Sequence, residues 1–226
     1  MNEDDKRVAV VTGAAGALGG ALVSRLMEQG WDCVAIDRDR RGLEKLHDRL
    51  AADGHAPLVV PVDLAGAAPQ HFGELAENLA AEFGRVDALI HAAADFRALT
   101  PVEHHPADQW MQVLQAGLTG PFLLTQSLLP MLRATPGSRM LFVVDAPEQR
   151  QRAYWGAYGV TQSAREALAA ILAAEGRTDG PDVRSVDPGP FYSPLRSRAW
   201  PAENPADLPT PEQAAERVLE ALRSVQ

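Results

Sequence analysis

The chain has 226 residues, of which 46% are hydrophobic and 23% charged, and its formal net charge is −9. Its length suffices for one domain with a sizeable core, and its acidic balance argues against an extended surface for nucleic acid or anionic membranes. The single cysteine, Cys33, excludes a disulfide framework and fits a reducing compartment. We expect a cytoplasmic protein, because the N-terminal residues MNEDDKR do not resemble a signal peptide and no apolar run could cross a bilayer.

Short apolar or β-branched runs alternate with longer helical patterns along the whole chain. The predicted strands cover residues 8–12, 32–36, 58–62, 86–91, 139–144 and 183–186. The predicted helices cover residues 17–29, 41–52, 71–83, 108–132, 155–175 and 211–225. Strand–helix alternation of this kind predicts parallel βαβ units, and hence a single α/β domain over residues 1–226 with helices on both faces of a doubly wound sheet.

A proline-rich segment separates the last predicted strand from the last predicted helix. Residues 188–211 hold seven of the seventeen prolines, a density that rules out a continuous helix. Because helix-like sequence follows it, we interpret residues 188–210 as a lid loop over a substrate or cofactor rather than as a flexible tail.

The stretch TGAAGALG, from Thr12 to Gly19, follows the first predicted strand and leads directly into a helix. Glycines let backbone amides approach a pyrophosphate, and a helix N-terminus favours negative charge. Ligands of doubly wound sheets bind beyond the carboxyl ends of the strands, so this turn predicts a dinucleotide site. The alternative is a tight strand–helix turn without a ligand.

Acidic residues end the second and third predicted strands. Asp37 can accept hydrogen bonds from both ribose hydroxyls and repel a 2′-phosphate, which favours NAD(H) over NADP(H). Arg38 could instead meet that phosphate, and a solvated turn is the alternative for both residues. Asp63 is placed to meet the adenine, unless it caps the next helix.

These features resemble the short-chain dehydrogenase/reductase family over nearly the whole chain. The TGxxxGxG turn is present with Ala17 at its middle glycine, residues 62–64 match the adenine-contacting motif, and Pro188-Gly189 matches the motif that meets the nicotinamide amide. Residues 90–94, IHAAA, stand where the family has its NAG stretch, with Asn and Gly both replaced by alanine. The cofactor contacts that these motifs predict are Thr12, Gly13, Ala15, Gly16, Ala17, Leu18, Gly19, Asp37, Arg38, Asp63, Leu64, Ala92, Ala93, Ala94, Pro188 and Gly189.

The resemblance implies a Rossmann fold with the strand order 3-2-1-4-5-6. It also implies a catalytic tetrad of Asn, Ser, Tyr and Lys, of which Tyr158 matches the proton-exchanging tyrosine. Asp145 stands at the serine position, which polarises the carbonyl, and Gln162 at the lysine position, which holds the ribose and lowers the tyrosine pKa. Gly117 replaces the asparagine that anchors a water, so the tetrad is eroded and the active site is degenerate.

A free tyrosine has a pKa of about 10, and a neighbouring cation lowers a pKa by roughly 1–3 units. Gln162 removes that cation and an ionised Asp145 adds an anion, so we expect oxidation, which needs a phenolate base, to be severely impaired. Reduction stays open: an ionised Asp145 would repel a developing alkoxide, whereas a protonated Asp145 in an apolar site could donate a hydrogen bond. Packing, rather than catalysis, is the favoured reason for a tyrosine at position 158.

Three arginines lie near Tyr158 in the sequence, and one of them could pair with Asp145. Arg165 lies two turns beyond it on the same helix face, and Arg150 and Arg152 lie in the loop before it; we expect all three to be solvated. The histidines show no metal-ligand spacing, so no metal is predicted; the histidines concerned are His47, His55, His104 and His105.

Two functions remain open, beside a third possibility, a structural relic without cofactor, which the retained glycines and Asp37 weaken and which Ala92 and Ala94 keep open. The first is an oxidoreductase that binds NAD(H) and acts, with impaired chemistry, on an unknown small carbonyl or alcohol. The second is a non-catalytic dinucleotide-binding protein that serves as a sensor, scaffold or subunit partner. The chain stops at Gln226, so we expect no seventh strand and no association through that edge, although a homodimer through helices 108–132 and 155–175 is plausible.

Overall fold

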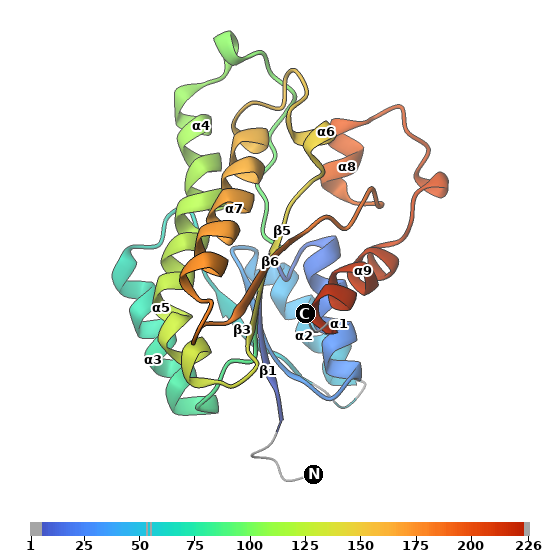
Figure 1. The fold of residues 1–226 in the computed structure, drawn as a ribbon. Coiled ribbons are helices and arrows are strands. Elements are labelled where there is room, and N and C mark those ends of the chain that lie inside the picture. Colours follow the sequence, from blue (N-terminus) through green and yellow to red (C-terminus); the bar gives the residue numbers. More distant parts are fainter. Residues whose placement is uncertain (1–5, 53, 55, 224–226) are drawn as a thin grey trace.

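The computed structural model describes residues 6–52, 54 and 56–223, which form one parallel sheet between two layers of helices (Figure 1). The six strands have the order β3-β2-β1-β4-β5-β6, and every neighbouring pair is parallel. This confirms the predicted fold class. The strands are β1 (Val8–Thr12), β2 (Asp32–Asp37), β3 (Leu58–Pro61), β4 (Ala88–His91), β5 (Arg139–Val143) and β6 (Asp182–Val186).

Helices cover both faces of the sheet. They are α1 (Ala17–Glu28), α2 (Arg40–Ala52), α3 (Pro69–Phe83), α4 (Ala107–Leu114), α5 (Gly120–Ala134), α6 (Pro147–Arg150), α7 (Gly156–Glu175), α8 (Pro194–Ala199) and α9 (Pro211–Arg223). Position 225, which the sequence assigned to the last helix, lies outside the described residues. Among the helices of the described residues, none combines the length and the apolarity that a bilayer-spanning segment requires.

Two apolar clusters form the core on the two faces of the sheet, and a third, smaller cluster surrounds Trp155 and Tyr158. Ala9 and Val11 of β1 face α1, α2 and α9, whereas Val8 and Val10 face α3, α5 and α7. This alternation follows from the two-residue period of a strand. Because both faces are covered, the interiors of β1, β2 and β5 are apolar, and the polar residues of the site follow the ends of the strands.

The predicted helix 108–132 is interrupted, which corrects its description as one regular helix. Residues Gln115–Thr119 form a π-helical turn between α4 and α5. Pro121 has no backbone N–H, so it cannot donate to the carbonyl of Gly117 four residues earlier. That carbonyl accepts a hydrogen bond from Arg165 Nε at 2.6 Å instead. A side chain of α7 therefore takes the place of a bond within the helix.

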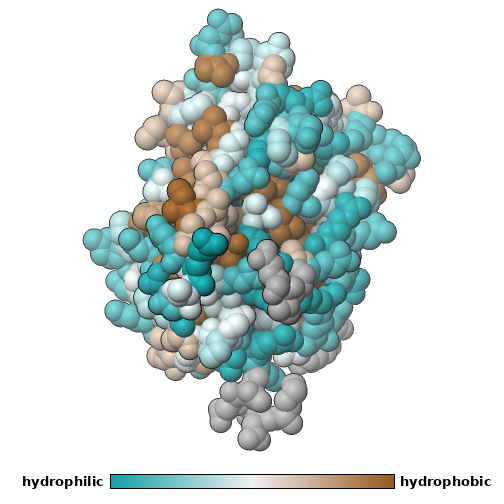
Figure 2. Space-filling model, in the orientation of Figure 1, coloured by the Kyte–Doolittle hydropathy of each residue, from teal (hydrophilic) through white to brown (hydrophobic). Residues whose placement is uncertain are grey.

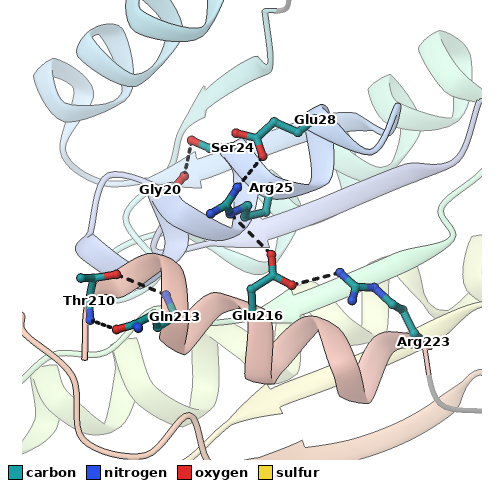
Figure 3. A network of polar contacts seen from close by, with 8 residues as sticks. All are labelled: Gly20, Ser24, Arg25, Glu28, Thr210, Gln213, Glu216 and Arg223. Carbon is teal, nitrogen blue, oxygen red and sulfur yellow. Dashed lines mark hydrogen bonds and ion pairs between the residues drawn. The ribbon is translucent and has the colours of Figure 1, made fainter. Parts of the chain in front are cut away.

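Helix α9 packs along α1, and polar contacts join the two helices (Figure 3). Arg25 of α1 binds Glu28 at 2.8 Å and lies 3.5 Å from Glu216 of α9. Arg217 of α9 donates to the carbonyl of Pro188 at 2.9 Å. The segment 188–210, which contains α8 and a 3₁₀ turn at Pro205–Asp207, is thus tied at its first residue to the helix that follows it.

Candidate active site

The glycine-rich turn between β1 and α1 depends on two glycines. Gly13 has φ +73°, and a Cβ there would lie 2.7 Å from the Cα of Ala93. A Cβ at Gly19 would lie 2.1 Å from the carbonyl oxygen of Gly13. The N-cap of α1, Gly16, has no side-chain cap and the first turn carries no acidic residue. The turn therefore presents bare backbone at a helix N-terminus, where phosphate groups bind favourably.

Asp37, at the end of β2, supports this turn directly. Its Oδ2 accepts a hydrogen bond from the N–H of Ala15 at 3.1 Å, and its Oδ1 accepts one from the N–H of Asp39 at 2.9 Å. A carboxylate has about four acceptor positions, so Asp37 keeps capacity for ribose hydroxyls. Asp63 accepts from the N–H of Ala65 at 3.0 Å within its own turn rather than at the start of α3, which begins at Pro69.

Arg38 faces an acidic residue that the sequence did not single out. Its guanidinium lies 3.6 Å from Asp95, which is 6% exposed and also binds Arg97 at 2.8 Å. Asp95 directly follows the alanine stretch 92–94, at the carboxyl end of β4. Its position after that strand was the available signal, because ligand-facing residues of this fold follow the strands.

Nearly all of the predicted site residues line one cleft of about 1140 Å³. Thr12 and Gly117 do not line it. Thr12 is fully buried beneath the cleft, and its hydroxyl accepts a hydrogen bond from the N–H of Ala93 at 3.2 Å. The predicted residues that do line it are Gly13, Ala15, Gly16, Ala17, Leu18, Gly19, Asp37, Arg38, Asp63, Leu64, Ala92, Ala93, Ala94, Asp145, Tyr158, Gln162, Pro188 and Gly189. The cleft therefore joins the glycine-rich turn to the tyrosine.

Tyr158 and Asp145 form a hydrogen-bonded pair in the wall of this cleft. The phenol of Tyr158 donates to Oδ2 of Asp145 at 2.9 Å. Burial, followed by the neighbouring Asp145, raises the pKa of Tyr158 well above 10. The tyrosine is therefore a neutral donor at physiological pH, and its proton points to a carboxyl group.

Burial and the surrounding polar and charged side chains determine the pKa of Asp145. Burial raises its pKa from the ordinary value, the hydrogen bond from Tyr158 and the cations Arg196 and Arg165 lower it, and Asp187 raises it. Asp187 directly follows β6, lines the cleft and accepts a hydrogen bond from the N–H of Gly189 at 2.8 Å. The sequence did not single out Asp187, although its place before the Pro188-Gly189 motif was a usable signal.

Gln162, one turn after Tyr158, contacts the backbone of the same aspartate. Its Oε1 accepts a hydrogen bond from the N–H of Asp145 at 3.1 Å, and the side chain is 3% exposed. The amide thus fixes the strand end that carries Asp145. It supplies no charge that could lower the pKa of the tyrosine.

Arg165 is buried, not solvated as expected. It is 1% exposed, and it donates to the backbone carbonyls of Gly117 at 2.6 Å and Val143 at 3.3 Å, and to that of Ala93. Burial lowers its pKa to about 10, so it is a cation at neutral pH, and Tyr158 and Asp145 both oppose that shift. The guanidinium therefore joins the ends of β4 and β5 to the π-helical turn, directly behind the tyrosine.

The other two arginines differ from one another. Arg150 is 5% exposed and forms an ion pair with Glu166, which corrects its expected solvation. Arg152 is exposed, and its guanidinium lies 4.6 Å from the ring centre of Trp200, which also lines the cleft. Within the described residues, Arg150 is paired with Glu166 and Arg152 lies over Trp200, and neither forms an ion pair with Asp145.

Gly117 is required by the packing around it. A Cβ at this position would lie 2.9 Å from the Cβ, Cγ2 and Oγ1 atoms of Thr161, which is 1% exposed. An asparagine, the residue that the family resemblance places here, does not fit beside Thr161. Gly117 and Arg165 thus belong to one arrangement, because the same glycine provides the carbonyl that Arg165 binds.

The histidines form no metal centre in the part of the chain that the structure describes, where no group of three or more His, Cys, Asp or Glu side chains could hold an ion. His55 lies outside the described residues. His91, fully buried on β4, is a core residue: it stacks on Phe142 with ring centres 4.7 Å apart and binds Thr125 at 2.9 Å. Burial lowers the pKa of His91 to about 3, so it is neutral.

Comparisons with known proteins show which family the chain is similar to. The family model of the short chain dehydrogenases matches residues 7–204. A D-threitol dehydrogenase from Mycolicibacterium smegmatis is 30% identical over 196 residues, covering 87% of this chain and 74% of that enzyme. A solved short chain dehydrogenase from Pseudomonas syringae is 35% identical with a TM-score of 0.87, covering 91% of this chain and 84% of that one. A short chain dehydrogenase from Shigella flexneri, solved with NADP, is 26% identical with a TM-score of 0.88, covering 93% and 89% of the two chains. This chain belongs to the short-chain dehydrogenase/reductase family.

Proposed function

We propose that this protein is a nicotinamide-dinucleotide-dependent oxidoreductase whose site favours reduction and whose alcohol oxidation is impaired. One observation carries the proposal: the phenol of Tyr158 donates a hydrogen bond to Asp145 in the wall of the cleft that begins at the glycine-rich turn. A phenol with a raised pKa stays protonated at neutral pH, so little phenolate is present to take a proton from an alcohol.

The residues of the cleft fit a dinucleotide. The turn at Gly13–Gly19 and the N-terminus of α1 would hold the pyrophosphate, because the glycines let the backbone pack tightly there and leave the helix N-terminus without a side-chain cap. Asp37 would accept hydrogen bonds from the adenosine ribose, and the amide of Gln162 would donate to the other ribose. When bound, the nicotinamide ring donates or accepts the hydride.

We propose that NAD(H) is favoured over NADP(H). The carboxylate of Asp37 is a poor neighbour for a 2′-phosphate. Arg38, the residue that could attract this phosphate, lies 3.6 Å from Asp95, whose charge offsets its own. The Shigella flexneri relative was solved with NADP, so the fold itself accommodates a dinucleotide with a 2′-phosphate.

A second function is favoured by Gln162. Its amide is engaged with the backbone of Asp145, and no cation at this position prepares the tyrosine for proton exchange. The protein could therefore bind the dinucleotide without turnover and serve as a sensor, scaffold or subunit partner. The two functions share the cleft and differ in whether Tyr158 takes part in chemistry.

We further propose a cytoplasmic homodimer through α4, α5 and α7. Four large apolar side chains of these helices are more than 40% exposed: Met111, Phe122, Val160 and Ile171. Hydrophobic residues gather over these helices in Figure 2. Burial of such a patch is a common reason for self-association, and sedimentation velocity of the wild type and of Ile171→Glu would test it: a monomeric wild type would refute the dimer.

The functional test begins with fluorescence titration of NADH and NADPH. We expect the wild type to bind NADH more tightly, and Asp37→Ser to shift the ratio toward NADPH by about tenfold. Failure of both dinucleotides to bind would refute the proposal and its alternative together.

A panel of carbonyl compounds and imines then separates the two functions. Reduction of any member of the panel by the wild type, with NADH consumed in equal amount, would establish the enzyme. Binding without turnover, with activity gained in the double variant Asp145→Ser and Gln162→Lys, would establish the non-catalytic alternative. Gly117 is left unchanged in that variant because Thr161 leaves no room for a larger residue.

A further inference from the structure

The substrate end of the cleft carries two carboxyl groups, those of Asp145 and Asp187, which both line it. The two cations that act on Asp145 are engaged with other groups: Arg196 binds Glu203 through two hydrogen bonds of 2.6 and 2.7 Å, and Arg165 donates to backbone carbonyls. Arg198 also lines the cleft, but it is exposed and donates to the carbonyl of Pro194 at 3.3 Å. A substrate beside Tyr158 therefore meets carboxyl oxygen first.

This arrangement disfavours a carbonyl substrate. Reduction of a carbonyl develops negative charge on oxygen, which needs a hydrogen-bond donor or a cation in the transition state. Here the one phenolic proton of Tyr158 already points to Asp145 at 2.9 Å. A carboxylate next to a developing alkoxide raises the barrier instead of lowering it.

The same arrangement suits a substrate that arrives with a positive charge. Within the described residues, the structure pairs only Oδ2 of Asp145 with a side chain, and Oδ1 is left for an N–H donor. A carboxylate beside a protonated imine stabilises its charged form, just as an opposite charge shifts any pKa. A protonated C=N bond is also much more electrophilic than a neutral one, so keeping the proton on nitrogen promotes hydride addition.

The side chains that line the substrate end of the cleft indicate the chemistry of the rest of the substrate. Trp155 lies against Tyr158 with ring centres 5.5 Å apart, and it lines the cleft together with Leu195 and Ala199. Aromatic faces attract organic cations and bury apolar surface. A cyclic imine with a hydrocarbon body fits these walls better than a polyol.

We propose that the substrates are protonated imines, which Asp145 binds through their N–H, and that the protein reduces them to amines; this rests on the proposed dinucleotide-dependent function. The iminium carbon accepts a hydride, with its two electrons, from the reduced nicotinamide dinucleotide. The π pair of the C=N bond becomes the lone pair of the amine nitrogen, and the positive charge passes to the oxidised dinucleotide. Because the nitrogen already carries its proton, no residue transfers a proton during the hydride step.

The replaced tetrad is consistent with this reaction. The family lysine, serine and asparagine prepare a proton transfer to or from oxygen, and a protonated imine does not need that transfer. Gln162, Asp145 and Gly117 instead position one carboxylate: Gln162 binds its backbone at 3.1 Å, and Gly117 receives the arginine that lies behind the pair. Asp145 is the catalytic residue of the proposal, and Gln162 and Arg165 are positioning residues.

The first test measures binding, independent of turnover. The probe is 1,2,3,4-tetrahydroisoquinoline, a cyclic secondary amine that is protonated at neutral pH, titrated by calorimetry into the full chain with NAD⁺ present. We expect Asp145→Asn to weaken its binding at least tenfold while NADH affinity stays within twofold. Asp179→Asn, which removes an exposed carboxylate in the turn after α7, is the matched control and should bind like the wild type.

The second test measures turnover of 3,4-dihydroisoquinoline and of its carbonyl counterpart, 2-tetralone. We expect reduction of the imine alone, and at least a tenfold loss in Asp145→Asn. An amide can donate a hydrogen bond to a carbonyl, so ketone reduction that survives in Asp145→Asn would overturn the proposal in favour of a protonated, donating Asp145.

Different results would overturn the imine assignment and the proposed function. Equal amine affinity in the wild type and Asp145→Asn, with normal NADH binding, would overturn the imine assignment and leave the proposed oxidoreductase standing. Absence of NADH binding would overturn both.

Discussion

Replacing Arg165 should destabilise the protein strongly, because its guanidinium holds three parts of the site together. In Arg165→Met, which keeps a long helix-compatible side chain, the carbonyls of Ala93, Gly117 and Val143 lose their donor. The carbonyl of Gly117 has no substitute within its helix, since Pro121 lacks an N–H.

The size of the effect can be worked out from these contacts. A buried acceptor that loses its partner costs about 1–3 kcal/mol, and the contacts to Ala93 and Gly117 are short. Removing a buried cation recovers part of that cost, because its desolvation is no longer required. We therefore expect a net loss of about 2–4 kcal/mol in the free energy of unfolding, which lowers Tm by roughly 4–16 °C for a chain of this size.

Urea unfolding followed by circular dichroism, together with calorimetric Tm, measures this change. Arg165→Lys should lie between the wild type and Arg165→Met, because an ammonium keeps the charge but not the forked geometry. Arg177→Ala, at an exposed arginine just beyond α7, is the control and should change stability by less than about 0.5 kcal/mol. If Arg165→Met were as stable as the wild type, the reasoning about the three carbonyls would be wrong.

Three further predictions concern the turn, the π-helical segment and the carboxylate. Gly117→Ala should cost about 1–3 kcal/mol by overpacking, whereas Gly73→Ala, in a helix with open space around it, should be neutral or stabilise by up to about 1 kcal/mol; thermal unfolding of both checks this. Gly19→Ala should abolish NADH binding in a fluorescence titration while circular dichroism stays native, because its Cβ would lie 2.1 Å from a carbonyl oxygen of the turn; unchanged affinity would contradict that geometry. Asp145→Asn should stabilise the protein at neutral pH, and the gain should vanish below the ordinary pKa of 3.8. The sign follows because a raised carboxyl pKa means that the folded state disfavours the ionised form, and this penalty grows as pH rises from 3.8 through the folded pKa. Urea unfolding at pH 3 and pH 7 measures the difference, and a gain in stability that is larger at pH 3 would contradict it.

The fold was predictable because it rests on local patterns. Strand–helix alternation gave the class, and the family resemblance gave the strand order, which the structure confirms. The interruption at Gln115–Thr119 was not predicted, because it depends on a bond from a different helix to the carbonyl that Pro121 leaves unpaired. Sequence periodicity shows which residues share a helix or strand face. It does not show which distant side chain donates a hydrogen bond to an unpaired backbone carbonyl.

Site residues were predictable from the sequence where their role depends on their own backbone conformation or on their position directly after a strand. Gly13, Gly19 and Asp37 belong to that group, and all three line the cleft. The burial of Arg165 could not be predicted, although its face was known. A buried guanidinium needs several acceptors, and these come from the ends of β4 and β5 and from the π-helical turn, which meet only in the folded chain.

The central claim is that Tyr158 is a neutral donor to Asp145 and not a base awaiting its lysine. Carbon-13 NMR of the tyrosine ζ carbons tests it directly, since the chain has three tyrosines and the exposed Tyr154 and Tyr192 serve as internal references. We predict that Tyr158 keeps the chemical shift of a protonated phenol up to pH 10, because burial and the neighbouring Asp145 raise its pKa. Ionisation of Tyr158 below pH 10 would contradict the account.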